Sequence, residues 1–288
     1  MKLCQTNVRV SSSIKARVSS ASIVLILVLF SIELQQFASA QQLGASVSVA
    51  NAPLNVEQVV ANLVGMNRER AEALHTYRGT RIYRAEYRGF PGTRSAEMVV
   101  NVKYQSPGTK EFTIQSATGS KMIIDKVFKK LLQAEKETVS AEAQRHIALN
   151  DDNYDFTLVG CECTPFGLMY VLSVEPRTKD TFLYHGRIWV DAEDFAVARL
   201  EVEPAKSPSF WTKNSEVEQV YMKVDDFWLP ARNHSVTAIR FGGRAELAIQ
   251  YNNYQITAAD PVGSLPTREP TQSADTRCPR HLAQAAKE

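Results

Sequence analysis

Alternation of apolar and polar residues runs through Tyr184–Thr257, and this pattern limits the fold more than any other feature of the chain. In Ala196–Glu203 and in Arg244–Asn252, every second residue is apolar. The apolar members are Ala196, Ala198, Leu200 and Val202 in the first segment and Ala245, Leu247, Ile249 and Tyr251 in the second. Period-two alternation is typical of antiparallel sheet with one dry face and one wet face.

Short turns divide this stretch into a meander. The predicted strands are Tyr184–Val190, Ala196–Glu203, Glu216–Val224, Phe227–Phe241 and Arg244–Ile256. Gly242 and Gly243 readily supply the positive φ angles of a tight hairpin, and Asp is favoured in the other turns. Asp191, Glu193 and Asp194 would also suit a cation site, but we interpret them as a hairpin turn because of this preference for Asp.

Helices and further strands precede the meander. Asn55 is expected to cap a helix whose apolar residues recur at helical spacing from Val56. In Met122–Ala148, an apolar stripe is opposed by polar residues that include Glu135, and a break near Ser140 would give two helices instead of one. The expected strands of this region are Arg78–Arg88, Ala96–Tyr104, Glu111–Ser116, Tyr154–Cys161 and Phe166–Val174.

A single antiparallel sheet of this length must curl or close to protect its edges. We therefore predict an α+β fold, a curved antiparallel half-open β-barrel of about 10–11 strands capped by helices. The barrel domain is expected over residues 54–258, after a flexible leader at 41–53. Residues 259–288, rich in Pro, Thr, Ser and Ala, predict a disordered tail.

The first 40 residues are typical of a secretory signal peptide. A basic, Ser-rich region precedes an apolar core at Ile23–Phe30, and Ala38-Ser39-Ala40 forms a small-x-small cleavage pattern. The alternative is a membrane anchor, but Ala21–Leu34 is shorter than the roughly 20 apolar residues that a spanning helix needs. No lipobox precedes the cleavage site. We expect cleavage after Ala40, export to the periplasm and a mature protein without a lipid anchor.

Charge argues against a nucleic acid partner. The whole chain has a formal net charge of +2, and removing residues 1–40 takes off +3 and leaves −1. A near-neutral protein lacks the basic footprint of nucleic acid recognition and the polybasic segment that anionic membranes attract. We expect a monomer.

No pattern in the chain points to catalysis. The histidines His75, His146, His185, His234 and His281 do not form a metal-binding spacing, and the sequence has no nucleophile elbow, P-loop or dinucleotide fingerprint. We therefore expect no enzyme activity, no cofactor and no metal.

Three cysteines remain after removal of the signal peptide, an odd number for an exported protein. Cys161 and Cys163 stand two apart on a predicted strand, and Cys278 lies in the tail. Three interpretations of these cysteines stay open. They are a disulfide from Cys278 to either strand cysteine, a soft-metal site of thiolate ligands, or small buried residues beside a turn.

Aromatic residues are the candidates for a ligand-binding surface in the barrel or at its rim. They are Phe166, Tyr170, Trp189, Phe195, Phe210, Trp211, Trp228 and Phe241. The alternative for each is ordinary core packing, because most buried aromatic residues serve that role. Phe210 and Trp211 follow a proline in a segment that interrupts the strands, so they are the first candidates for a rim element.

Several of these segments together resemble the bacterial outer-membrane lipoprotein-sorting protein family, and most closely its uncharacterised acidobacterial members. The likeness covers roughly Val56–Thr257. The segments that carry it are Gly186–Asp191, Phe195–Glu201, Pro204–Trp211, Phe227–Pro230 and Ile249–Tyr254. The resemblance implies an incomplete antiparallel barrel capped by helices, in which the LolA/LolB-like carriers hold lipoprotein acyl chains. Those carriers lock their lid with an arginine, and no motif chooses among Arg78, Arg81 and Arg84 for that role.

The expected function is therefore a periplasmic carrier that shields acyl chains of lipids or lipoproteins without covalent chemistry. An alternative is a sensor or regulatory module on the same fold that binds an envelope protein. A third is a structural envelope protein with a filled core.

Overall fold

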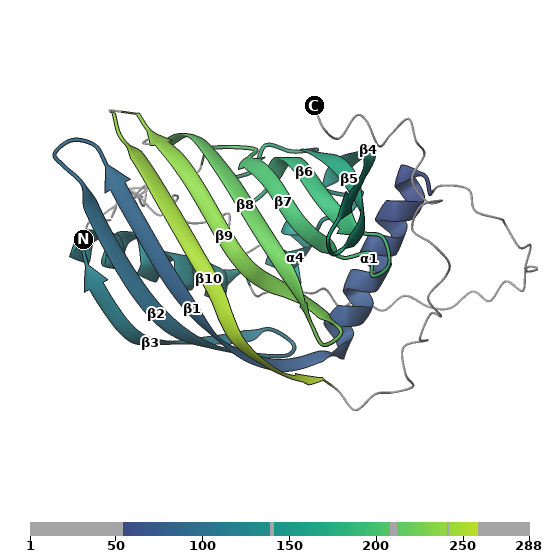
Figure 1. Ribbon diagram of the computed structural model, residues 1–288, viewed down its shortest axis with the longest axis horizontal. Coiled ribbons are helices and arrows are strands. Elements are labelled where there is room, and N and C mark those ends of the chain that lie inside the picture. The colour runs from purple at the N-terminus through teal and green to yellow at the C-terminus, as the bar shows by residue number, and fades with distance from the viewer. Residues whose placement is uncertain (1–53, 139–140, 208–211, 241, 259–288) are drawn as a thin grey trace, which may run out of the picture.

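The computed structural model describes residues 54–138, 141–207, 212–240 and 242–258, which form one curved antiparallel sheet with helices on one of its faces (Figure 1). The strands are β1 (Leu74–Arg88), β2 (Arg94–Gln105), β3 (Thr109–Gly119), β4 (Tyr154–Thr164), β5 (Gly167–Pro176), β6 (Tyr184–Asp191), β7 (Val197–Pro204), β8 (Thr212–Val224), β9 (Phe227–Ile239) and β10 (Arg244–Ala258). Their order across the sheet is β3-β2-β1-β10-β9-β8-β7-β6-β5-β4.

The sheet does not close on itself. Strands β3 and β4 are its two edges, and every neighbouring pair between them is antiparallel. The pairing of β1 with β10 joins the two ends of the described chain in the middle of the sheet, with Tyr83 opposite Ile249. The prediction of a curved, half-open antiparallel barrel of about ten strands is confirmed.

The helices begin and end where local chemistry sets them. They are α1 (Val56–Ala73), α2 (Lys121–Ile123), the π-helical turn η2 (Ile124–Phe128), α3 (Lys129–Glu137) and α4 (Ala141–Ile147). Asn55 caps α1: its side-chain oxygen accepts a hydrogen bond from the Gln58 backbone amide, and the Gln58 side-chain oxygen accepts one from the Asn55 backbone amide. The predicted break near Ser140 falls between α3 and α4.

We call the face that the helices cover the inner face, and the opposite face the outer face. In Figure 1 the outer face is turned to the viewer, and the teal helices that follow β3 lie behind the sheet. A first core cluster joins α1 to the inner face of β4–β8, and a second joins η2 and α3 to that of β1, β2 and β10. The inner face is therefore covered by two separate helical elements, one for each half of the sheet.

One β-bulge changes the predicted alternation. Between β6 and β7 the register shifts, so that Trp189 pairs with Arg199 while Val190 pairs with Val197. Ala198 then packs on the outer face beside Trp189, whereas Val197 belongs to the inner core. Strict period two would have kept Ala198 on the same face as Leu200; the extra residue of the bulge reverses its direction.

Gly186 fits a place on β6 that no other residue can occupy without strain. Its φ is +145°, and an added Cβ would lie 2.3 Å from the Glu201 carbonyl oxygen and 2.8 Å from the Val202 Cα. We expect Gly186→Ala to lower the free energy of unfolding by about 2–3 kcal/mol. Urea denaturation of the purified protein measures this change.

Gly65 provides the matched control, because it lies inside α1 with nothing within 4 Å of an added Cβ. Gly65→Ala should raise the free energy of unfolding by about 0.5–1 kcal/mol, since Ala is the better helix former. Equal effects of the two substitutions would contradict the steric argument for Gly186.

Candidate functional site

A row of inner-face side chains crosses the sheet in register from β4 to β2. Its members, each opposite the next, are Leu158, Leu172, Ile188, Leu200, Gln219, Asn233, Ile249, Tyr83 and Met98. All are apolar or aromatic except the pair Gln219 and Asn233. This row of the inner face is therefore apolar across the sheet, with one polar pair in its middle.

Two helical covers keep water from this surface. Val59 and Leu63 of α1 are 0% exposed in the first cluster, and Phe128 and Leu131 are 0% and 3% exposed in the second. Burial of a side chain such as Leu63 or Phe128 contributes about 2 kcal/mol. Apolar contact thus supplies most of the attraction between the covers and the sheet.

The second cover is also held by a buried ion cluster. Glu135 of α3 accepts hydrogen bonds from both terminal nitrogens of Arg81 on β1, at 2.6 and 3.0 Å. Lys110 of β3 donates to the same carboxylate at 3.0 Å. The side chains of Arg81, Glu135 and Lys110 are only 8%, 8% and 7% exposed. One carboxylate on the helix therefore bonds to cations on two strands. Its two parallel hydrogen bonds with Arg81 are the bidentate geometry in which a carboxylate and an arginine bind most strongly.

The pKa values of the cluster follow from this pairing. Burial alone would raise the pKa of Glu135, but Arg81 and Lys110 outweigh it and lower that pKa to about 2. Burial likewise opposes the charge of Arg81, and Glu135 outweighs it, so that the pKa of Arg81 rises well above its usual value. All three groups are therefore charged at neutral pH.

Aromatic rings complete the surroundings of Arg81. Its guanidinium lies 5.0 Å from the ring centre of Tyr251 and 5.6 Å from that of Phe112, within cation–π range. One of its nitrogens also donates to the Tyr83 hydroxyl at 3.3 Å. The planar guanidinium is thus fixed between the sheet and α3, a geometry that a lysine would not reproduce.

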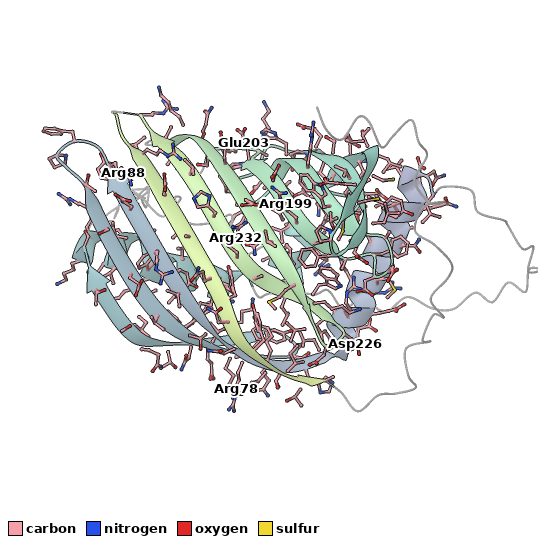
Figure 2. All side chains as sticks on the ribbon, viewed as in Figure 1. Arg78, Arg88, Arg199, Glu203, Asp226 and Arg232 are labelled. Carbon is pink, nitrogen blue, oxygen red and sulfur yellow. The ribbon has the colours of Figure 1, made fainter. Side chains whose placement is uncertain are left out.

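The structure distinguishes the three arginines that the sequence leaves equivalent. Arg81 points to the inner face, whereas Arg84 pairs with Glu97 on the outer face with about half of each side chain exposed. Arg78 is exposed and lies at the lower edge of the sheet in Figure 2. Of the three, only Arg81 contacts a cover helix.

The role of Glu135 was missed by the sequence analysis, which placed it among the polar residues opposite the apolar stripe. Glu135 instead lies on the buried side of α3, because it follows Leu131 by four residues and so shares its face. That spacing is the signal that could have found it.

The predicted aromatic residues do not gather in one place. Tyr170 and Phe195 lie in the first inner cluster, with nearly parallel rings 6.3 Å apart. Trp228 packs against that cluster, and its indole N–H donates to Asp194 at 2.8 Å. These three residues belong to the inner core near α1. Phe210, Trp211 and Phe241 lie outside the described residues.

Trp189 and Phe166 lie elsewhere. Trp189 is on the outer face, where its indole N–H donates to Glu162 at 2.7 Å and the Arg199 guanidinium lies 5.0 Å from its ring. Ile188, its neighbour on β6, takes the inner position because adjacent strand residues face opposite sides. Phe166 is 87% exposed, because β5 begins one residue later and leaves it in the turn after β4.

The acidic segment after β6 is a turn, as interpreted. The Asp191 carboxylate accepts hydrogen bonds from the backbone amides of Glu193 and Asp194, and Asp194 pairs with Lys223 at 2.7 Å. Arg70 of α1 donates to the Asp194 backbone oxygen at 2.8 Å, so this turn also holds the end of α1. Across the described part of the chain, His, Cys, Asp and Glu residues form no group of three or more that could hold a metal ion.

The two cysteines of β4 differ. Cys161 is buried in the first inner cluster and is disulfide-bonded, while Cys163 is exposed and free. Cys278 lies outside the described residues.

Away from the apolar residues around Trp189, the outer face carries paired polar side chains. A depression of about 410 Å³ lies over β1, β2, β3, β9 and β10 and is lined by residues that include Arg84, Glu97 and His234. Further across the sheet, Glu218 binds both Arg199 and Arg232, two residues that Figure 2 places on the face turned to the viewer. Within the described ranges, no helix combines the length and apolar character needed to cross a membrane.

The fold and the site together define a class: a half-open antiparallel barrel with helical covers over an apolar inner face. No protein-family model matches the chain, and no curated protein sequence matches it.

Several solved structures are similar to it. One is a Vibrio parahaemolyticus domain described as an outer membrane lipoprotein-sorting protein domain, with 12% identity over 70% of this chain and 94% of that one, at a TM-score of 0.35. Another is the LolA superfamily protein NE2245 from Nitrosomonas europaea, with 9% identity over 72% and 96%, at 0.32. A third is the Pseudomonas aeruginosa MucA/MucB complex, with 10% identity over 70% and 98%, at 0.24. Because each TM-score is below 0.5, we argue the function from this chain's own residues.

Glu135→Gln should destabilise the fold, because it leaves Arg81 and Lys110 buried without a carboxylate. We expect a loss of about 3–5 kcal/mol in the free energy of unfolding at pH 7. The pKa of Glu135 is about 2 in the folded state, against an ordinary value of 4.5. Its stabilising contribution is therefore complete above pH 4.5 and is lost as the pH falls towards 2.

Urea denaturation between pH 2 and pH 7 tests this expectation, and the variant should lack that part of the pH dependence. Glu97→Gln serves as the control, since its partner Arg84 is half exposed and surface pairs contribute less than about 1 kcal/mol. A Glu135→Gln variant as stable as Glu97→Gln would contradict the proposed importance of the cluster.

Proposed function

We propose that this chain is a periplasmic carrier that shields acyl chains of lipids or lipoproteins against the inner face of its sheet, in outer-membrane lipoprotein sorting and without covalent chemistry. One observation carries the proposal: α3 covers an apolar sheet face and is fixed there by a single buried ion cluster, Arg81–Glu135–Lys110. A cover whose polar contacts with the strands centre on one carboxylate over an apolar surface is suited to open and close.

The proposed mechanism is movement of the cover. In the closed state, Glu135 satisfies two buried cations and the apolar residues of α3 fill the inner face. In the open state, these cations meet water and an acyl chain takes the place of α3 on the sheet. The π-helical turn Ile124–Phe128 lies directly before α3, and such turns interrupt helices at functional positions. This turn is the proposed hinge.

The free energy of burying an acyl chain can offset the cost of displacing α3 from the sheet. Burial contributes about 0.8 kcal/mol per CH₂ group, so a C16 chain offers about 10 kcal/mol before the cost of ordering it. The acyl chain replaces the apolar contacts that α3 gives up on the sheet, and the remainder offsets the roughly 3–5 kcal/mol expected for breaking a buried ion pair. Displacement of the cover therefore needs no covalent step.

The chain is expected to enter near the β9–β10 hairpin. There, the inner-face residues Ala85 and Leu247 are only partly buried, whereas Tyr83 and Ile249, one row deeper, are each 1% exposed. Accessible apolar residues thus lead from this end of the sheet to the closed interior.

Native mass spectrometry tests the proposal. Mature protein purified from the envelope without detergent should carry a bound mass that extracts as phospholipid, fatty acid or acylated peptide, and the stripped protein should bind a fluorescent fatty acid. A protein that carries no lipid and takes up none after incubation would overturn the carrier function.

A pair of matched variants tests the location. Ala85→Trp adds a large side chain on the inner face and should weaken fatty acid binding at least about tenfold, because it occupies the path of the chain. Ala248, opposite Arg84 on the neighbouring strand, points to the outer face, so Ala248→Trp should bind as the wild type does. Equal affinities of the two variants would place the acyl chain elsewhere.

One observation favours a second candidate, the binding of an envelope protein. Strand β3 is an unpaired edge of the sheet, and nine of its eleven residues, from Thr109 to Gly119, are exposed. Such an edge can accept an added strand from a partner. A protein that stays free of lipid in the experiment above, yet co-purifies with an envelope protein, would support this candidate.

We also infer that the disulfide partner of Cys161 is Cys278, because Cys163 is free and Cys4 belongs to the segment expected to be cleaved. The bond would fasten the C-terminal segment to β4.

Peptide mapping without reduction should yield a Cys161–Cys278 peptide from exported protein. Cys278→Ser should leave Cys161 open to alkylation after denaturation, with Cys163→Ser as the control; an unchanged disulfide in Cys278→Ser would refute the pairing.

A further inference from the structure

The amide pair Gln219–Asn233 interrupts the apolar row of the inner face at the middle of the sheet. Asn233 is 0% exposed and Gln219 is 5% exposed, and their apolar neighbours in the row are Leu200 and Ile249. The pair lies between the two core clusters, since the first cluster ends at β8 and the second resumes on β9 and β10.

The hydrogen bonds of this pair leave one acceptor atom, Asn233 Oδ1, without a donor. The Asn233 side-chain N–H donates to Gln219 Oε1 at 2.8 Å, and the Gln219 side-chain N–H donates to the Val220 backbone oxygen at 3.3 Å. Among the described residues, no group donates a hydrogen bond to Asn233 Oδ1. Gln219 therefore fixes the direction of the Asn233 amide, and Asn233 presents a bare oxygen.

Packing and stability do not account for this arrangement. A buried polar atom without a partner costs about 1–3 kcal/mol, whereas two apolar side chains of similar shape would be neutral or stabilising. Every other member of the row shows that apolar side chains fit this face. An acceptor that is buried and oriented but unsatisfied is suited to receive a donor from outside the chain.

A polar path leads to Asn233 from the accessible end of the sheet. Ser235 and Thr237 follow at two-residue steps on the inner face of β9, and both are partly exposed. Thr237 lies 2.9 Å, hydroxyl to hydroxyl, from Ser215 on β8. This path begins at the β9–β10 hairpin, where the acyl chain is expected to enter.

We propose that Asn233, oriented by Gln219, is a polar subsite that binds the N–H group of an amide joined to the acyl chain of the ligand. This inference rests on the proposed carrier function and names the ligand class: N-acylated amphiphiles. An ester or an ionised carboxylate has no donor for Asn233 Oδ1, so fatty acids and simple ester lipids leave this oxygen unsatisfied. The subsite thus distinguishes acylated molecules by the bond that carries the chain.

Two probes that differ by the replacement of this N–H with N–CH₃ test the proposal. N-methylpalmitamide has one N–H donor, and N,N-dimethylpalmitamide has none. The wild-type protein should bind the first about tenfold more tightly, as expected for satisfying one buried acceptor. Competition against a fluorescent fatty acid measures both affinities. Equal affinities in the wild type would overturn the subsite.

Variants locate the effect. The double variant with Asn233→Leu and Gln219→Leu makes the row entirely apolar; it should bind both amides and lose the tenfold preference. His234→Leu, the next residue on β9 and on the outer face, should keep the preference. A preference that survives in the double variant would refute the role of Asn233. If the double variant fails to fold, Asn233→Leu alone answers the same question.

The outcomes separate this inference from the proposed function. Binding of both amides with equal affinity refutes the subsite and leaves the carrier function intact. Failure of the wild type to bind either amide or the fluorescent fatty acid overturns both.

Discussion

The need to keep the apolar inner face of the sheet from water governs this structure. The sheet places two large clusters of apolar side chains on one face, and an unclosed sheet cannot cover that surface with its own strands. Helices must therefore supply the cover. Because α1 and α3 cover opposite halves of the sheet, the proposed opening of one half would leave the other half packed.

The ion cluster around Glu135 gives the cover of the second half a defined position on the sheet. Apolar contacts attract α3 to the sheet without fixing its place, whereas the bidentate contact with Arg81 is directional. A buried ion pair adds little net stability compared with apolar residues of the same size. Its presence here fits the proposed movement of α3, in which the cluster would set the closed position.

Much of the fold followed from local patterns, and the site did not. Alternation located most strands, and the turn residues located their ends, because both reflect interactions between near neighbours in sequence. Alternation could not place Ala198, because a single bulge between β6 and β7 turns it to the outer face beside Trp189. Residue type alone likewise could not separate Tyr170, which is buried on the inner face, from Phe166, which is exposed in the turn before β5.

The sequence by itself determined a curved antiparallel sheet with one apolar face, amphipathic helices to cover it and the break between α3 and α4. Periodicity encodes these features because each residue's direction depends on its immediate neighbours. Only the tertiary structure decided that Glu135 meets Arg81, 54 residues away, and that Gln219 pairs with Asn233 within an apolar row. Such contacts depend on strand register and helix placement, which are set by the packing of the whole sheet.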